Sequence, residues 1–231
     1  MSSAVLIGCT GLVGSHILKN LISSDAIAAV NTFSRRPLPE ASEKVNSFVS
    51  HDTSQWIDGI MDVSPRPTIL FSAFGTTRAA AGSFENQYKI DHALQLELAR
   101  AANQAGCRVC VLISSSFAND SSSIPYARMK GRIEEDIKAL QFEETIILRP
   151  GMILGARTEG RPAEDVAQSI VKGIGLISPS CKNMLGQEAS VIAEAATKVG
   201  IQCLTDKPLD SREIPRVRFI ERSDIVKHAR T

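Results

Sequence analysis

The chain has 231 residues, of which 43% are hydrophobic and 22% charged, and its formal net charge is +1. This length fits one ordinary globular domain. No block of like charges offers a surface to nucleic acid or to an anionic membrane, and the longest apolar runs are well short of the roughly 20 residues that cross a bilayer. We therefore expect a small-molecule partner, no nucleic acid and no transmembrane segment.

The cysteines and the first residues bear on the cellular compartment. Five cysteines, an odd number, predict free thiols in a reducing environment. Cys107 and Cys110 have a spacing seen in metal sites, but no second Cys/His pair accompanies them, and residues 108–113 indicate a buried strand. An apolar strand begins almost directly after Met1-Ser2-Ser3, which leaves no room for a signal peptide or an Arg-rich presequence.

Apolar runs and helical periodicity alternate along the chain. Strands are expected at residues 4–7, 29–33, 45–49, 68–74, 109–113, 145–148 and 217–220. Helices are expected at residues 12–22, 85–105, 126–140, 164–174 and 188–203, with a closing helix capped by Ser223-Asp224. This alternation predicts an α/β fold, a Rossmann-type doubly wound parallel sheet in a single domain of residues 1–231, to which residues 152–231 add a small C-terminal substrate lobe.

A glycine-rich turn, Gly8 to Gly14, follows the first expected strand and opens the first expected helix. Glycine is needed where such a turn bends sharply, where the backbone approaches a pyrophosphate and where the helix packs on the strand. The helix N-terminus then offers N–H groups and a positive dipole end to the phosphates. The residues expected to hold a dinucleotide here are Gly8, Thr10, Gly11, Leu12, Val13 and Gly14.

Arg35 and Arg36 stand about 20 residues after Gly14, where an NAD-preferring site places a carboxylate for the ribose 2′-hydroxyl. Two guanidinium groups match a 2′-phosphate in charge and in fork geometry. We therefore predict NADP(H) as the cofactor. The alternative is a solvated pair of surface arginines.

Two further loops follow expected strands and are candidates for cofactor contacts. Asp52 could accept a hydrogen bond from the adenine amino group, and the backbone of Gly75 and Thr76 is expected to pass close to the cofactor. Both assignments rest on the rule that ligands bind outside the carboxyl ends of parallel strands. Ordinary loop chemistry would explain either residue equally well.

Tyr126 and Lys130 are four residues apart at the start of an expected helix and therefore share one face. A neighbouring ammonium group favours the phenolate form, and a serine hydroxyl can hold a carbonyl oxygen beside the phenol. Ser114, Ser115 and Ser116 end the preceding strand. This arrangement could protonate a carbonyl group while a nicotinamide delivers hydride, although the Tyr/Lys spacing also occurs by chance on helix surfaces.

With these motifs the chain resembles the atypical branch of the short-chain dehydrogenase/reductase superfamily over nearly its whole length. Within it, the chain is similar to the fungal Fmp-type mitochondrial proteins and the Tat-interacting oxidoreductase-like proteins of animals. The segments that carry this narrower resemblance are residues 76–82 (TTRAAAG), 87–92 (QYKIDH), 129–131 (MKG) and 148–151 (LRPG).

The resemblance implies NADP(H) binding, Tyr126 as proton donor or acceptor with Lys130 beside it, and Pro150 near the nicotinamide. Ser115 is the expected site serine, and Ser116 is the alternative that extended members of the superfamily suggest. Asp91 departs from the pattern, because many members have an asparagine there that serves a water relay. An ionised aspartate accepts but cannot donate a hydrogen bond, so any relay must work differently.

Two functions follow from these residues. The first is an NADPH-dependent reductase that acts on a carbonyl or quinone-like small molecule. The second is an NADP-binding regulatory or scaffolding protein with little or no turnover. The resemblance also implies peripheral attachment to the cytosolic face of the mitochondrial outer membrane, or a cytoplasmic location, with a membrane or protein partner. Arg161 is a weak candidate for a substrate contact.

Overall fold

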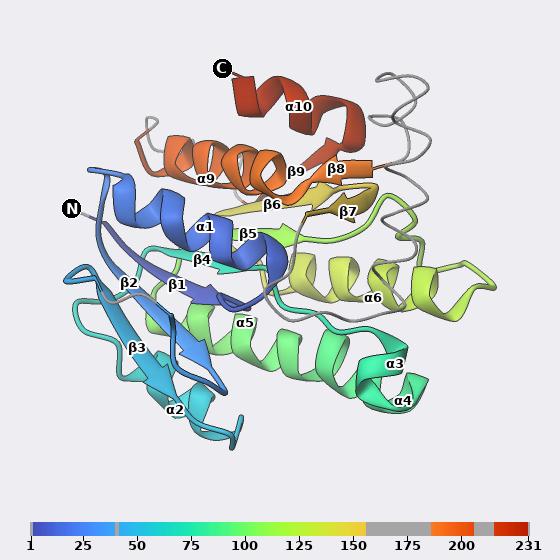
Figure 1. The fold of residues 1–231 in the computed structure, drawn as a ribbon, viewed down its shortest axis with the longest axis horizontal. Coiled ribbons are helices and arrows are strands. Elements are labelled where there is room, and N and C mark those ends of the chain that lie inside the picture. Colours follow the sequence, from blue (N-terminus) through green and yellow to red (C-terminus); the bar gives the residue numbers. More distant parts are fainter. Residues whose placement is uncertain (1, 40–41, 156–185, 206–214, 231) are drawn as a thin grey trace.

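The computed structural model describes residues 2–39, 42–155, 186–205 and 215–230. Its centre is a seven-stranded parallel sheet in the order β3-β2-β1-β4-β5-β6-β9 (Figure 1). The strands are β1 (Ser2–Ile7), β2 (Ile27–Ser34), β3 (Val45–Val49), β4 (Ile69–Ser72), β5 (Val109–Ile113), β6 (Glu144–Arg149) and β9 (Arg216–Glu221). The predicted doubly wound Rossmann-type sheet is therefore confirmed.

Helices cover both faces of this sheet (Figure 1). One face carries α1 (Leu12–Ser23), α9 (Ala189–Thr205) and α10 (Arg222–Arg230). The other carries α2 (Gln55–Met61), α5 (Gln95–Ala105) and α6 (Pro125–Ala139). No helix in the described ranges combines the length and apolar character needed to cross a membrane.

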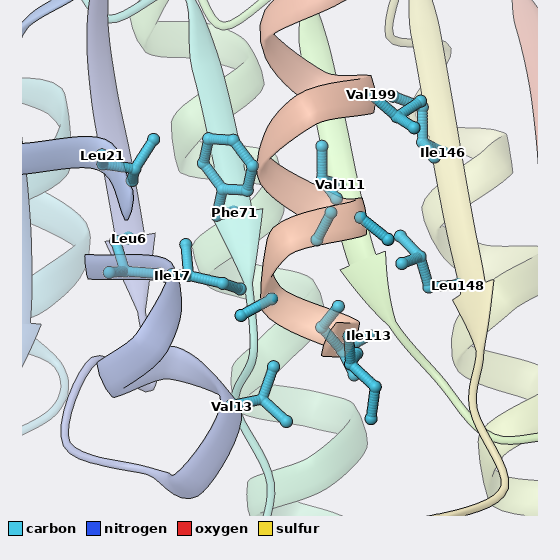
Figure 2. Close-up of a cluster of buried hydrophobic side chains, with 14 of the residues drawn as sticks. Leu6, Val13, Ile17, Leu21, Phe71, Val111, Ile113, Ile146, Leu148 and Val199 are labelled. Atoms are coloured by element: carbon cyan, nitrogen blue, oxygen red, sulfur yellow. The ribbon is translucent and has the colours of Figure 1, made fainter. Parts of the chain in front are cut away.

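The strand residues alternate between two hydrophobic cores, one on each face. Ala4 and Leu6 of β1 pack under α1 and α9, whereas Val5 and Ile7 pack under the opposite helices, and all four are fully buried. Strands covered on both sides bury the side chains of both faces and are therefore apolar at most positions, which explains the nearly continuous apolar runs in the sequence. Figure 2 shows the first core, where α9 lies across β4, β5 and β6.

The helix expected over residues 85–105 is interrupted. It consists of α4 (Phe84–Tyr88), a π-helical segment η1 (Lys89–Leu94) and α5. A π segment adds one residue to a turn and often marks a functional position. Here it contains Asp91, whose side chain is almost fully buried.

Four short elements were not expected from the pattern: α2, α3 (Arg78–Ala81), β7 (Met152–Leu154) and β8 (Gly186–Glu188). The last two form a separate parallel pair. Three of these elements have three or four residues, which is too short for periodicity to reveal, and α2 has only seven.

The chain beyond residue 186 belongs mainly to the body of the fold. Strand β9 completes the sheet beside β6, and α9 packs on α1 and α10. The helix expected at residues 164–174 and Arg161 lie outside the described residues, so the small substrate lobe stays a prediction. Cys107 and Cys110 are buried free thiols beside and within β5, and burial raises the pKa of Cys110 to about 12.

Backbone packing around the first turn fixes how β1, α1 and β4 meet. A Cβ atom on Gly14 would lie 2.0 Å from the carbonyl oxygen of Gly8, and one on Gly8 would lie 2.4 Å from that of Ala73. Gly8 also has a left-handed φ of +82°. Only glycine allows the helix to approach the strand and the strand end to approach the β4 loop this closely.

Replacing Gly14 with alanine therefore forces backbone apart, and we expect Gly14→Ala to lower the free energy of unfolding by more than about 3 kcal/mol. Gly82→Ala is the matched control, because Gly82 has a φ of +81° but a Cβ atom added there would have nothing within 4 Å. Left-handed strain alone should cost about 1–2 kcal/mol there. Urea unfolding measures both, and equal losses would contradict the close packing of Gly14.

Candidate functional site

The crevice at the carboxyl ends of β1 and β4 is the topological switch point of the sheet, because the strand order reverses between these two strands. The turn from Gly8 to Gly14 and the loop from Ala73 to Thr76 meet at this point, because a Cβ atom on Gly8 would lie 2.4 Å from the carbonyl oxygen of Ala73. Helix α1 begins at this crevice with no side-chain cap and no acidic residue in its first turn. Its N-terminal N–H groups are therefore suited to an anionic group such as a pyrophosphate.

Some residues of the turn could contact a ligand through their side chains, and others only through their backbone. Thr10 and Leu12 are partly exposed at the crevice, whereas Val13 is only 6% exposed and packs into the core. Val13 can therefore reach a ligand only through its backbone. A Cβ atom on Gly155 would lie 3.1 Å from Leu12 Cδ1, so the end of β7 comes close to the start of α1.

At the end of β2, Arg35 and Arg36 are both exposed. Ser34 Oγ donates a hydrogen bond of 2.6 Å to the carbonyl oxygen of Arg36, which fixes the turn that carries the two guanidinium groups. The pair lies beyond the strand next to β1, at the same edge as the glycine turn. A role in binding a 2′-phosphate stays a prediction.

Asp52 is exposed on the loop between β3 and α2. Its Oδ1 accepts hydrogen bonds from Ser54 N at 3.0 Å and from Ser54 Oγ at 2.6 Å. These bonds hold the pKa of the carboxyl group below its ordinary value. Asp52 thus has a turn-forming role, and the predicted contact with adenine could use only its other oxygen, Oδ2.

The loop after β4 is held in place by Asp91, which sequence reasoning noted only as a departure from the family pattern. Asp91 Oδ1 accepts a hydrogen bond of 2.6 Å from Thr76 N, and Gln87 Nε2 donates one of 3.0 Å to the carbonyl oxygen of Thr76. Gly75 lies beside the same carboxylate. The backbone of Gly75 and Thr76 is therefore fixed at the crevice by the π segment.

Asp91 also connects this loop electrostatically to Lys130, which is 5% exposed. Burial raises the pKa of the Asp91 carboxyl group, while the charge of Lys130 and hydrogen bonds from Thr76 and Gln87 act in the opposite direction. The one buried side chain of Asp91 thus holds the loop after β4 and also interacts with the ammonium group of Lys130. An asparagine could hold Thr76 but could not supply this charge.

Ser115, Tyr126 and Lys130 lie at the ends of neighbouring elements. Ser115 follows β5, and Tyr126 and Lys130 occupy the first turns of α6. The β5–α6 loop packs directly on this helix, because a Cβ atom on Gly131 would lie 2.1 Å from the backbone nitrogen of Asp120. The structure therefore brings the serine end of β5 to the start of α6, where Tyr126 is 40% exposed.

The three serines after β5 have different surroundings. Ser114 Oγ donates a very short hydrogen bond to Glu134 Oε1 in the interior, so its hydroxyl group is already occupied. Ser115 Oγ accepts a hydrogen bond of 3.3 Å from Phe117 N and keeps its own proton for another acceptor. Ser116 is partly exposed, and its N–H donates to the carbonyl oxygen of Pro150 at 2.8 Å. Ser115 and Ser116 both remain candidates.

A buried ion-pair network supports these loops and was not found from the sequence. Glu134, 1% exposed on α6, accepts hydrogen bonds from Arg149 Nη2 at 2.5 Å and from Arg149 Nε at 3.1 Å, in addition to the bond from Ser114. Arg149 also pairs with Glu221 of β9 and lies over the ring of Phe219. Glu134 therefore joins the ends of β5 and β6 to the helix that carries Tyr126 and Lys130.

The turn after β6 has a second support. Gln187 of β8 is 4% exposed, accepts a hydrogen bond of 3.2 Å from Gly151 N and donates one of 2.9 Å to the carbonyl oxygen of Arg222. This glutamine fixes the backbone next to Pro150, the residue expected near a nicotinamide. Little in the sequence indicated this support, because Gln187 is a polar residue in a segment too short to be assigned as a strand.

Comparison with known sequences identifies the family. The family model described as HIM1 matches residues 42–175. The protein fmp52-1, mitochondrial, of Aspergillus terreus is 51% identical over 98% of this chain and 98% of its own length. The chain belongs to the Fmp52 family. This result confirms the fungal Fmp-type resemblance inferred from the four short segments.

Solved structures share the fold at low sequence identity. A short-chain dehydrogenase/reductase from Saccharomyces cerevisiae aligns with a TM-score of 0.68 at 14% identity, over 97% of both chains. The UDP-glucuronic acid 4-epimerase of Bacillus cereus, solved in complex with NAD, aligns with a TM-score of 0.65 at 13% identity, over 95% of this chain and 76% of the epimerase. The Fmp52 chain thus has the fold of dehydrogenases and epimerases that use nicotinamide cofactors.

Replacing Arg35 and Arg36 with serine should weaken NADPH binding about 10-fold or more and leave NADH binding nearly unchanged. A charge-assisted hydrogen bond to a 2′-phosphate contributes about 1.5–3 kcal/mol, and NADH lacks that group. Calorimetric titration with both nucleotides measures the difference. Arg66→Ser is the control for loss of an exposed positive charge elsewhere, because Arg66 is exposed beside Gly106, before β4 begins. Equal losses for NADPH and NADH would exclude the 2′-phosphate role.

Replacing Glu134 with glutamine should lower the free energy of unfolding by about 3 kcal/mol, because the guanidinium group of Arg149 loses its buried counter-charge. Glu135→Gln is the control on the same helix. Glu135 is half-exposed and pairs only with Lys138, so the expected loss is within about 0.5 kcal/mol. Urea unfolding compares the two variants, and similar values would show that the Glu134 network does not stabilise the fold.

Proposed function

We propose that this Fmp52 chain is an NADP(H)-dependent oxidoreductase of the short-chain dehydrogenase type that reduces a carbonyl or quinone-like small molecule. The observation that carries the proposal is the position of Ser115, Tyr126 and Lys130 at the carboxyl edge of the sheet, beside the switch-point crevice. Proton-transfer groups beside a glycine turn and an uncapped helix N-terminus are what reduction by a nicotinamide requires.

Each residue has a separate part in this reaction. Bound NADPH would supply a hydride to the carbonyl carbon. As the C=O π bond breaks, Tyr126 donates its hydroxyl proton to the carbonyl oxygen, so that new C–H and O–H bonds form. Ser115 donates a hydrogen bond that holds this oxygen, and the Lys130 ammonium group stabilises the phenolate that remains.

The fit to NADP(H) rests on the geometry of the crevice. The uncapped start of α1 favours the pyrophosphate, and Arg35 and Arg36 favour the 2′-phosphate. Pro150 follows β6, close enough for its carbonyl oxygen to accept the hydrogen bond from Ser116 N, which suits the expected position of the nicotinamide. Asp52 would contribute through Oδ2 to the adenine end.

Asp91 favours a second candidate function, an NADP-binding regulatory or scaffolding protein with little turnover. Its side chain lies near Lys130, where a reductase of this type usually has an asparagine for its water relay, and the charge of Lys130 favours the carboxylate form of Asp91. A lysine that interacts with this carboxylate is less available to a phenolate. The same carboxylate holds Thr76 at the crevice, so cofactor binding would be unaffected.

The proposed location is the cytosolic face of the mitochondrial outer membrane, or the cytoplasm. The curated relatives are named mitochondrial, which supports the first. Attachment would be peripheral, through a membrane surface or a protein partner.

Tyr126→Phe separates the two functions. Because Tyr126 is partly exposed and phenylalanine keeps the ring, we expect NADPH affinity to stay within about twofold while NADPH oxidation falls at least about 100-fold. Calorimetry and the absorbance of NADPH with a panel of aldehydes, ketones and quinones measure the two quantities.

Tyr88→Phe is the control, since Tyr88 and Tyr126 are the two tyrosines of the chain and Tyr88 stacks on His92 through its ring alone. It should change neither quantity. Tight NADPH binding by the wild-type chain without any oxidation would favour the regulatory protein, and no binding of either nucleotide would exclude both functions.

A further inference from the structure

Large apolar side chains are exposed on the segments that carry or flank the candidate active-site residues. Phe117 is 70% exposed, Ile124 65% and Met152 43%. They come from the β5–α6 connection and from β7, which lie at the same edge of the sheet (Figure 1). We call these three residues the apolar rim.

Chain connectivity places every member of the rim next to a residue of the proposed site. Phe117 follows Ser115 by two residues, Ile124 precedes Tyr126 by two, and Met152 follows the end of β6 by three. Exposure of this much apolar surface is costly in water, and on a soluble domain it commonly marks a binding site.

Two members of the rim, Phe117 and Ile124, belong to a loop of fixed conformation, and Met152 belongs to β7. Phe117 N donates to Ser115 Oγ at 3.3 Å, and Ile124 N donates to Ser122 Oγ at 3.1 Å. Between them, Asn119 N donates to the carbonyl oxygen of Ala127 at 3.0 Å, which ties the loop to α6. The apolar side chains are therefore held in place beside the site by the backbone.

The same segments are almost uncharged. Residues 114–125 and 150–155 contain no lysine, arginine or histidine, and their single carboxylate is Asp120. Nearby cations have other roles: Arg149 pairs with Glu134 and Glu221, and Lys130 faces Asp91. Arg128 is two residues from Tyr126 on α6 and so points away from it. A phosphate or carboxylate on a substrate would find no counter-charge on these segments.

We propose that the substrate of this site is an uncharged carbonyl compound with an aromatic or extended aliphatic group, which the apolar rim contacts beside Tyr126. This inference rests on the proposed function for the identity of the reacting group. It adds the chemical class of the rest of the substrate. Burial against Phe117, Ile124 and Met152 favours substrates in which that part is apolar.

The test uses three ketones and the protein saturated with NADP+, which cannot deliver hydride, so that binding is measured without turnover. Acetophenone and 2-acetylnaphthalene are uncharged and differ in apolar area, and 4-acetylbenzoate carries a carboxylate. Calorimetry should give the tightest binding for 2-acetylnaphthalene and at least about 10-fold weaker binding for 4-acetylbenzoate than for acetophenone.

Phe117→Ser, Ile124→Ser and Met152→Ser should each weaken binding of 2-acetylnaphthalene by about fivefold to 10-fold. Met61→Ser is the matched control, because Met61 is 45% exposed at the end of α2, away from the rim. It should leave the affinity unchanged. Circular dichroism checks that all four variants are folded.

Absence of ketone binding, equal binding of 4-acetylbenzoate and acetophenone, or rim variants that match Met61→Ser would overturn the inference. NADPH oxidation by the wild-type chain is measured separately with the same ketones. Selective binding without oxidation would support the apolar site and count against the reductase. Oxidation that occurs only with charged carbonyl compounds would support the reductase and overturn the apolar substrate class.

Discussion

The close approach of three backbone segments at Gly8, Gly14 and Ala73 is the constraint on which the candidate site depends. It brings the start of α1 against the end of β1 and draws the β4 loop to the same point. The start of α1 at this point has no side-chain cap and no acidic residue in its first turn. The strand order and the helices on both faces of the sheet stabilise this contact. The glycines make it sterically possible, because they have no Cβ atom.

Helix α6 relates the crevice to the proposed chemistry. Its exposed end carries Tyr126, its buried face carries Lys130 and Glu134, and Gly131 admits the loop that follows β5. Lys130 faces Asp91, which in turn holds the loop after β4. The loop after β4 and helix α6 are thus connected through two buried groups of opposite charge. Such charges are stable in an interior only when each has its partner.

Much of this arrangement could be predicted from local patterns. Apolar runs predicted the seven strands of the main sheet, and spacing alone placed the glycine turn, Tyr126 and Lys130 at its carboxyl edge. What local patterns missed depends on tertiary contact. Glu134 has the helical spacing of a core residue, yet its partner Arg149 lies on another element, and no sequence rule pairs them. The π segment likewise could not be predicted from local patterns, because its residue Asp91 makes a tertiary contact with Thr76.

The position of α9 has a consequence for the order in which the chain folds. This helix covers Phe71, Val111 and Ile146 on strands that precede it by dozens of residues, and a Cβ atom on Gly200 would lie 2.9 Å from the ring of Phe71. During synthesis the central strands can pair before α9 has left the ribosome, but one of their faces then stays open to water. Such intermediates are aggregation-prone, and chaperones bind them. The half of this protein that carries the glycine turn therefore depends for its solubility on α9, which is synthesised after the strands that it covers.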